Sequence, residues 1–120
     1  MDDDGEFYSI IDYAVDGPET QRQLINVFAG LQDRWVRYYA GYLEATIFAS
    51  IDGDRVYNVV RWASEAHYRR FEEDSESDGR VAAIQASLAG LSGRAEPRMS
   101  GSPWFRVARV VRSGPRQYTD

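Results

Sequence analysis

The sequence contains no cysteine and no lysine, and His67 is its one histidine. Without cysteine the chain forms no disulfide and has neither a thiolate metal site nor a cysteine nucleophile. No apolar run approaches the ~20 residues that a membrane-spanning helix needs. The first residues, MDDDGEF, are acidic and lack the pattern of a signal peptide. These absences are compatible with a reducing compartment and predict a cytoplasmic protein with no membrane partner.

Size and charge narrow the class of protein further. The chain has 120 residues, of which 43% are hydrophobic, and it includes 3 Trp, 8 Tyr and 5 Phe. This composition predicts one globular domain over residues 1–120, with flexible tails at residues 1–5 and 113–120. The net charge of −5 argues against nucleic acid or an anionic membrane as a partner. Abundant Tyr and Trp favour a ligand pocket or an interface, because they combine an apolar body with a polar tip.

Hydrophobic periodicity predicts the secondary structure. Asp52-Gly53-Asp54 separates two alternating segments and predicts a hairpin turn, and Ser64 predicts the N-cap of the helix that follows. The expected elements, in order, are a strand over residues 6–15, a helix over 18–39, strands over 42–51 and 55–63, a helix from 64 that frays or becomes a loop over the acidic residues 72–79, a short helix over 81–91, a loop over 92–102 and a strand over 104–112.

The order strand, helix, strand, strand, helix, strand is the split βαβ pattern of a ferredoxin-like sandwich. This α+β fold has a four-stranded antiparallel sheet with helices on one face only. The predicted strands carry apolar residues on both faces, so the second face needs a cover. A second copy of the same sheet is the simplest cover, and we therefore expect a homodimer whose sheets pack face to face.

The second strand of the hairpin holds the most informative residues. Asn58 and Trp62 lie four residues apart, so their side chains point to one face, which they share with Val56 and Val60. An amide and an indole N–H among valines predict a mostly apolar pocket with a few aimed hydrogen-bond donors. Tyr68, on the helix that leaves this strand, could bring a phenol to the same region.

Each of these residues also has a purely structural interpretation. The Asn58 amide could satisfy a neighbouring backbone group, Trp62 could be a core residue, and Tyr68 could serve packing alone. Trp35 and Tyr39 could line the pocket, although a helix-spaced aromatic stripe is more often core.

The order of elements, the segments GYLEAT, FAS and DG that open the hairpin, and the N-x-x-x-W pair carry a resemblance to a known family. The chain resembles the antibiotic biosynthesis monooxygenase family, and in particular its quinone-forming members of the actinorhodin anthrone-oxidation type. The likeness covers about residues 7–111 and is strongest over residues 33–71. The segment NVVRWASEAHY matches the family's asparagine, tryptophan and tyrosine at the same relative spacings.

The resemblance implies a dimeric α+β barrel that oxidises an anthrone-like polycyclic aromatic polyketide intermediate to a quinone. The co-substrate is O₂, and no flavin, haem or metal takes part. It also implies that Asn58, Trp62 and Tyr68 are catalytic. Some members have a histidine where this chain has Phe48, and an arginine from the later helical region, to which Arg80 is the nearest match. The substrate-binding residues implied are Trp35, Tyr39, Phe48, Val60 and Arg80.

Three other functions use the same scaffold. A polyketide cyclase or isomerase would use the pocket without O₂, and a non-catalytic dimeric binding module would hold a ligand without turnover. Haem degradation would need a histidine two to three helical turns past the tryptophan, and the chain has Glu72 in that region and no histidine beyond His67. The sequence does not name the substrate, the oxidised carbon or the group that takes the proton.

Overall fold

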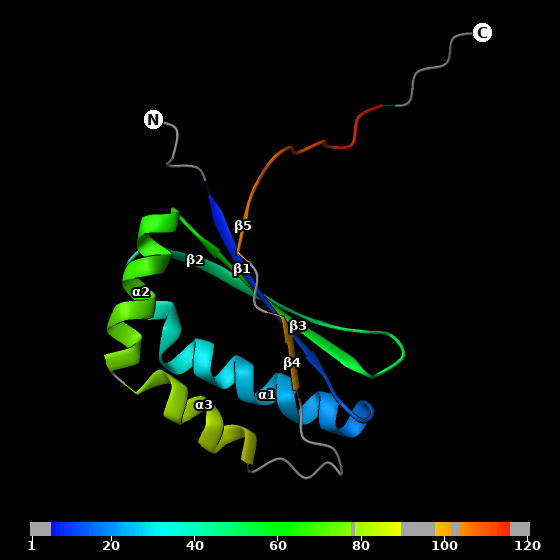
Figure 1. The fold of residues 1–120 in the computed structure, drawn as a ribbon. Coiled ribbons are helices and arrows are strands. Elements are labelled where there is room, and N and C mark those ends of the chain that lie inside the picture. The colour runs from blue at the N-terminus through cyan, green and yellow to red at the C-terminus, as the bar shows by residue number, and fades with distance from the viewer. Residues whose placement is uncertain (1–5, 78, 90–97, 102–103, 116–120) are drawn as a thin grey trace, which may run out of the picture.

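The computed structural model describes residues 6–77, 79–89, 98–101 and 104–115. Their strands form one sheet, and all the labelled helices lie on one side of it (Figure 1). No helix in these ranges is long and apolar enough to cross a membrane. The elements are β1 (Phe7–Ala14), α1 (Pro18–Arg34), the 3-10 helix η2 (Val36–Tyr38), β2 (Tyr42–Ala49), β3 (Arg55–Trp62), α2 (Glu65–Ser77), α3 (Arg80–Ala89), β4 (Arg98–Gly101) and β5 (Trp104–Arg106).

The sheet has the antiparallel order β2-β3-β1-β4, and β5 also pairs with β1. This is the predicted ferredoxin-like arrangement, with a fourth strand made of two pieces. β4 pairs with the C-terminal end of β1 and β5 with its N-terminal end. Residues 98–101 form a strand, and the prediction of a loop over them is wrong. The segment RMSG lacks apolar alternation, so its pairing with a distant strand is the feature that makes it a strand.

The last predicted strand is also shorter than expected. It ends at Arg106 instead of residue 112, because Arg106 pairs with Phe7, the first residue of β1. Beyond that point β1 offers no partner, and residues 107–115 run away from the body of the chain, exposed and without regular structure (Figure 1). The predicted tail at residues 1–5 lies outside the described residues, as do residues 116–120 of the predicted tail at 113–120.

The helices differ from expectation at two ends. The first helix ends at Arg34 instead of residue 39, because the backbone turns at Trp35 and continues as η2. α2 continues to Ser77, through most of the acidic segment 72–79 that was expected to fray or become a loop. Its inner side there is fixed by Ser75, which is fully buried, and by a bond from the Tyr68 hydroxyl to Glu72. At its start the Ser64 hydroxyl accepts a hydrogen bond from the His67 N–H at 3.2 Å, which is the predicted cap.

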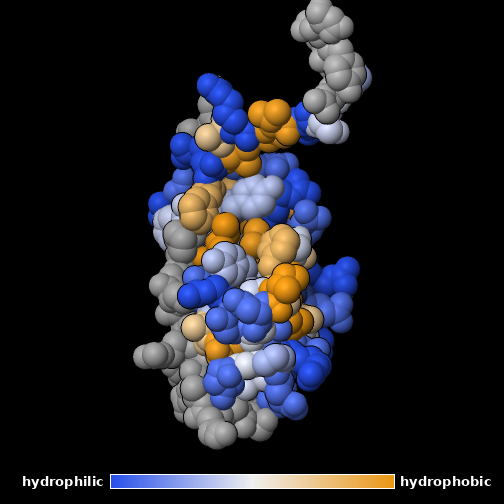
Figure 2. Space-filling model, turned by 90° about the vertical axis from the view of Figure 1, so that its right-hand side faces the viewer, coloured by the Kyte–Doolittle hydropathy of each residue, from blue (hydrophilic) through white to orange (hydrophobic). Residues whose placement is uncertain are grey.

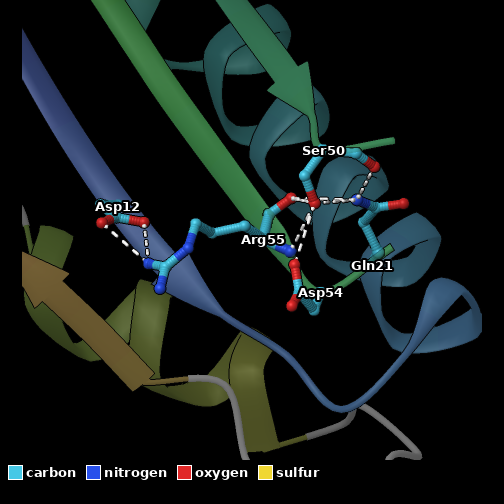
Figure 3. Close-up of polar contacts among 5 residues, drawn as sticks. All are labelled: Asp12, Gln21, Ser50, Asp54 and Arg55. Carbon is cyan, nitrogen blue, oxygen red and sulfur yellow. Dashed lines mark hydrogen bonds and ion pairs between the residues drawn. The ribbon is translucent and has the colours of Figure 1, made fainter. Parts of the chain in front are cut away.

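The β2–β3 hairpin is tied to α1 by a buried glutamine. The Gln21 amide donates to the Ser50 carbonyl at 3.1 Å and to the Arg55 carbonyl at 2.9 Å (Figure 3). Gly53 closes the turn with φ of 83°, and a Cβ there would lie 2.7 Å from the Pro18 side chain. The predicted turn is therefore held against the first turn of α1, which fixes how the hairpin lies over the helices.

Two apolar clusters lie between the sheet and the helices. One contains Phe7, Val36, Val60, Trp62, Tyr68 and Phe71, and the other contains Tyr13, Val15, Leu24, Phe28 and Val56. The opposite face of the sheet carries exposed aromatic residues, among them Phe48 at 55% and Tyr57 at 41% exposure. Figure 2 shows hydrophobic and polar groups mixed on the side of the molecule away from α2. Arg55 and Asp12 form an ion pair at 3.0 Å across β3 and β1 (Figure 3).

Candidate active site

Strand β3 directs Asn58 and Trp62 toward the helices, where they are 4% and 1% exposed. The Asn58 Oδ1 and the Trp62 Nε1 are buried, and neither has a hydrogen-bond partner among the described residues. Each unpaired buried polar atom costs about 1–3 kcal/mol. Two such atoms on one strand face are unfavourable for a plain core, and a ligand that pairs with both removes the cost.

Both residues line a partly open cavity between the sheet and the helices. Its volume is about 60 Å³, and Val60, which lies between Asn58 and Trp62 on the same strand face, lines it as well. The other polar side chains of its wall are Ser9, Gln32 and Tyr68. This is the composition of a small-molecule site, with a few polar groups set in an apolar surface. The remaining apolar wall is made by Ile11, Phe28, Leu31, Val36, Phe71 and Ile84.

Tyr68 reaches the cavity from α2. Its ring packs against Trp62 at 5.8 Å and against Trp104 at 5.4 Å between ring centroids. Its hydroxyl donates to Glu72 Oε2 at 3.1 Å, one helical turn further along α2. The structure thus brings together the three residues that the sequence analysis assigned to catalysis, with a carboxylate behind the phenol.

Of the five expected substrate-binding residues, Trp35 and Val60 line the cavity. The Trp35 Nε1 donates to the Tyr39 hydroxyl at 3.1 Å, so this indole nitrogen, unlike that of Trp62, is paired within the protein. Tyr39 is outside the cavity wall and packs its ring against Phe71 at 5.0 Å. Tyr39 therefore holds Trp35 in place and does not itself reach the cavity.

The structure does not bring Phe48 to the cavity. Phe48 pairs with Tyr57 across β2 and β3, and both side chains lie on the sheet face that the helices leave open. Ile47, which pairs with Asn58, is the β2 residue on the helix side. The alternation of side chains along a strand places neighbours on opposite faces. Arg80 is the first residue of α3, and its side chain lies outside the described part of the chain.

One polar residue of the cavity was not predicted from the sequence. Gln32 of α1 lines the cavity, and its Oε1 accepts a hydrogen bond from the Tyr42 hydroxyl at 2.8 Å. The Tyr42 ring in turn stands edge-on to Trp62, 5.6 Å away at 85°. A signal for Gln32 was present, because it follows the core residue Phe28 by four positions and so lies on the apolar stripe of the helix.

Burial raises the pKa of the Tyr42 phenol above its ordinary value, with Arg37 partly offsetting the effect and Glu44 adding to it. The hydroxyl therefore stays protonated at neutral pH and remains the donor to Gln32. Among the residues that the structure describes, no group of three or more His, Asp or Glu side chains is arranged to hold a metal ion.

At the level of sequence, no family model matches the chain. A curated relative, the tetracenomycin-F1 monooxygenase of Streptomyces glaucescens, is 29% identical over 69 residues, which are 58% of this chain and 62% of that protein. The match thus spans less than two thirds of the curated relative's length.

Solved structures match over most of the chain. A cofactor-independent oxygenase, SnoaB from Streptomyces nogalater, has a TM-score of 0.66 at 15% identity and covers 91% of this chain and 99% of its own. A dimeric ferredoxin-like protein from an uncultured marine organism has a TM-score of 0.67 at 12% identity, covering 89% of this chain and 99% of its own. At these identities the two matches show the fold alone.

A third solved structure shows closer kinship. The monooxygenase from the gene ActVA-Orf6 of Streptomyces coelicolor, solved with the ligand nanaomycin D, is 30% identical with a TM-score of 0.72. The match covers 94% of this chain and 96% of that one. Together with the order of elements and the N-x-x-x-W pair on β3, this match shows that the chain belongs to the antibiotic biosynthesis monooxygenase family, as its sequence predicted.

Proposed function

We propose that the protein is a cofactor-independent monooxygenase that oxidises an anthrone-like polycyclic aromatic phenol to a quinone with O₂. The observation that carries the proposal is the pair of unpaired buried atoms, Asn58 Oδ1 and Trp62 Nε1, in one aromatic-walled cavity. Such a cavity suits a flat aromatic ligand that bears oxygen substituents.

The chemistry balances without an external reductant. An anthrone CH₂ becomes a C=O, one atom of O₂ enters the carbonyl, and the other leaves as water. The substrate itself supplies the four electrons that reduce O₂. An acidic C–H of the substrate gives an anion delocalised onto a phenolate oxygen, and this electron-rich anion can pass an electron to O₂ directly. The protein's part is to bind the ring system, stabilise the anion and exclude water.

The two unpaired atoms have complementary roles. Trp62 Nε1 is a donor and is assigned to the developing oxyanion or to a reduced oxygen species. Asn58 Oδ1 is an acceptor and is assigned to a substrate hydroxyl, which refines the expectation that Asn58 would act as a donor. Tyr68, backed by Glu72 at 3.1 Å, is assigned to the edge of the bound ring system.

The relatives support the substrate class. One is named a tetracenomycin-F1 monooxygenase, and another was solved with nanaomycin D as its ligand. SnoaB, which shares the fold, is described as a cofactor-independent oxygenase. These descriptions favour an aromatic polyketide substrate and a reaction that uses O₂ alone.

The proposed assembly is a homodimer in which two sheets pack through their open faces to form an α+β barrel in the cytoplasm. The exposed aromatic residues Phe48 and Tyr57 on that face support it, as does the description of a protein of the same fold as dimeric. We expect each partner to lose several hundred Å² of surface, for a total of at least ~1,000 Å².

The test is oxygen uptake by chelator-treated protein mixed with a panel of anthrones, with no flavin, haem or metal added. The proposal predicts one O₂ consumed for each quinone formed. Turnover under argon would indicate a cyclase or isomerase instead. Tight binding with no turnover across the panel would indicate a binding module, and activity that returns only with flavin would contradict cofactor independence.

A further inference from the structure

The cavity beside Asn58 and Trp62 is small for the proposed substrate. It measures about 60 Å³, whereas sites for drug-sized ligands span roughly 300–1,000 Å³. A three-ring aromatic therefore extends beyond the cavity when its reacting carbon lies near Asn58 and Trp62. The hollows next to the cavity indicate the direction in which the ligand extends.

A surface groove of about 520 Å³ lies between α1 and β2, which run side by side (Figure 1). Its apolar lining is formed by Ile25, Ala29, Leu43, Ala45 and Ile47, and its charged lining by Asp33, Arg37 and Glu44. Gln32 is the one described residue that lines both this groove and the cavity beside Asn58 and Trp62. The two hollows are therefore neighbours with a shared wall.

That wall is made of side chains. Gln32 Oε1 accepts from the Tyr42 hydroxyl at 2.8 Å, and Tyr42 lines the groove while its ring stands edge-on to Trp62. Rotation of either side chain breaks one hydrogen bond and leaves the backbone unchanged. Once separated, the Gln32 amide and the Tyr42 phenol can each form a hydrogen bond with a substrate oxygen.

We propose that the substrate site continues from the cavity, past Gln32 and Tyr42, into the groove between α1 and β2. The reacting ring lies over Asn58 and Trp62, and the outer rings lie against the apolar residues that line the groove. Their oxygen substituents pair with Gln32 and Tyr42 at the junction. This inference rests on the proposed function for the size of the ligand. It assigns Gln32 as a specificity-determining residue and Tyr42 as the residue that positions it.

The absence of native cysteine makes a selective test possible. Ala29→Cys places a thiol in the groove and outside the cavity, on an exposed position of α1. Ala66→Cys is the matched control, an exposed alanine on α2 away from both hollows. Each thiol is capped with a bulky group through a disulfide that reductant removes. Binding of a three-ring anthrone and of a one-ring phenol is then followed under argon by tryptophan fluorescence.

The inference predicts that capping Ala29→Cys weakens binding of the three-ring ligand at least tenfold and leaves the one-ring phenol within twofold. Reductant restores binding, and the capped Ala66→Cys protein binds both ligands as before. If the capped Ala29→Cys protein binds the three-ring ligand as tightly as the uncapped protein, the inference is overturned. A cap that changes the oligomeric state and not the affinity also overturns it, because the groove then belongs to a partner chain.

A second variant tests the junction itself. Tyr42→Phe keeps the ring and removes the hydroxyl, so we expect the three-ring ligand to associate at least threefold faster in stopped-flow mixing, with the one-ring phenol unchanged. An unchanged association rate together with a lower melting temperature would show that the pair is only structural. Binding under argon and O₂ uptake after air is admitted separate the two proposals, because binding that is not followed by O₂ uptake contradicts the oxygenase and leaves the groove supported. Failure of the unmodified protein to bind either ligand overturns both.

Discussion

Asn58 and Trp62 lie four residues apart on the helix-facing side of β3, and they leave one acceptor and one donor unpaired in the same cavity. The β-strand geometry sets their common direction, and Val60 between them keeps the floor apolar. A hydroxyl-bearing aromatic that forms an oxyanion complements this pair, since one atom can accept and the other can donate. Substitutions at these two residues should therefore affect turnover and stability differently, because an unpaired polar atom that serves a ligand lowers the stability of the fold.

Replacing Trp62 by Phe should lower turnover by about 10- to 100-fold, at or below the lower end of the ~10²–10³ that removing one preorganised donor costs. Stability should change little, because the lost ring volume is offset by removal of an unpaired N–H. The matched control is Trp35→Phe, because the Trp35 N–H donates a hydrogen bond to the Tyr39 hydroxyl at 3.1 Å. That control should lower the melting temperature more and turnover less. The reverse ranking of the two variants would contradict the role of the Trp62 nitrogen.

Replacing Tyr68 by Phe should lower turnover more than tenfold while the ring keeps its contacts with Trp62 and Trp104. The bond to Glu72 is lost, which destabilises the fold by roughly 1 kcal/mol. Glu72→Gln retains an acceptor oxygen for the Tyr68 hydroxyl and should keep most of the activity. Steady-state turnover of the three proteins checks this, and equal activity in Tyr68→Phe and the parent would assign the hydroxyl to packing alone.

The open sheet face should be the dimer interface. Phe48 and Tyr57 are paired across β2 and β3 and are exposed, so an aspartate at either position buries an unpaired charge if the faces meet. Sedimentation should then show monomers at micromolar concentration. Tyr38→Asp, at an aromatic residue that is 74% exposed in η2, is the control and should remain dimeric. Dimers that tolerate both sheet substitutions would place the interface elsewhere.

Stability should fall at alkaline pH through Tyr13 and Tyr42. Burial is the main cause that raises both pKa values above the ordinary 10.0, so folding favours the neutral phenols. Their contribution is full below about pH 10 and is lost as pH rises through the raised pKa values. Because the chain has no lysine, tyrosines dominate this titration. Urea unfolding at pH 9 to 12 should show a smaller loss in Tyr13→Phe and Tyr42→Phe than in the parent, and identical losses would count against the assignment.

Much of the site could be predicted from local patterns. The two-residue period of β3 and the helix that follows it bring Asn58, Trp62 and Tyr68 together, and both features are visible in sequence. The same period argued against Phe48, since its neighbour Ile47 shares the face of Asn58. The expectation for Phe48 came from the family resemblance and not from this alternation. Gln32 was not predicted because polar residues on an amphipathic helix mostly face solvent.

The parts of the fold that sequence did not predict depend on distant partners. Residues 98–101 form a strand because β1 is beside them, and β5 stops at Arg106 because β1 begins at Phe7. The acidic end of α2 is helical because Tyr68, Phe71 and Ser75 form a buried stripe under its charged surface. Composition alone predicts a solvated loop there, and only the spacing of the buried residues indicates otherwise.

The central claim is that Asn58 is present for a ligand and not for the fold, and Asn58→Leu tests it most directly. Leucine has the same branched side-chain shape and no polar atom, so it removes the unpaired Oδ1 from the apolar cavity. The melting temperature of the ligand-free protein and the turnover of substrate are measured side by side for the parent and the variant. The account predicts an equal or higher melting temperature, by a few degrees, with turnover reduced at least tenfold. A lower melting temperature with unchanged turnover would show that Asn58 is a structural residue, and the site assignment would be wrong.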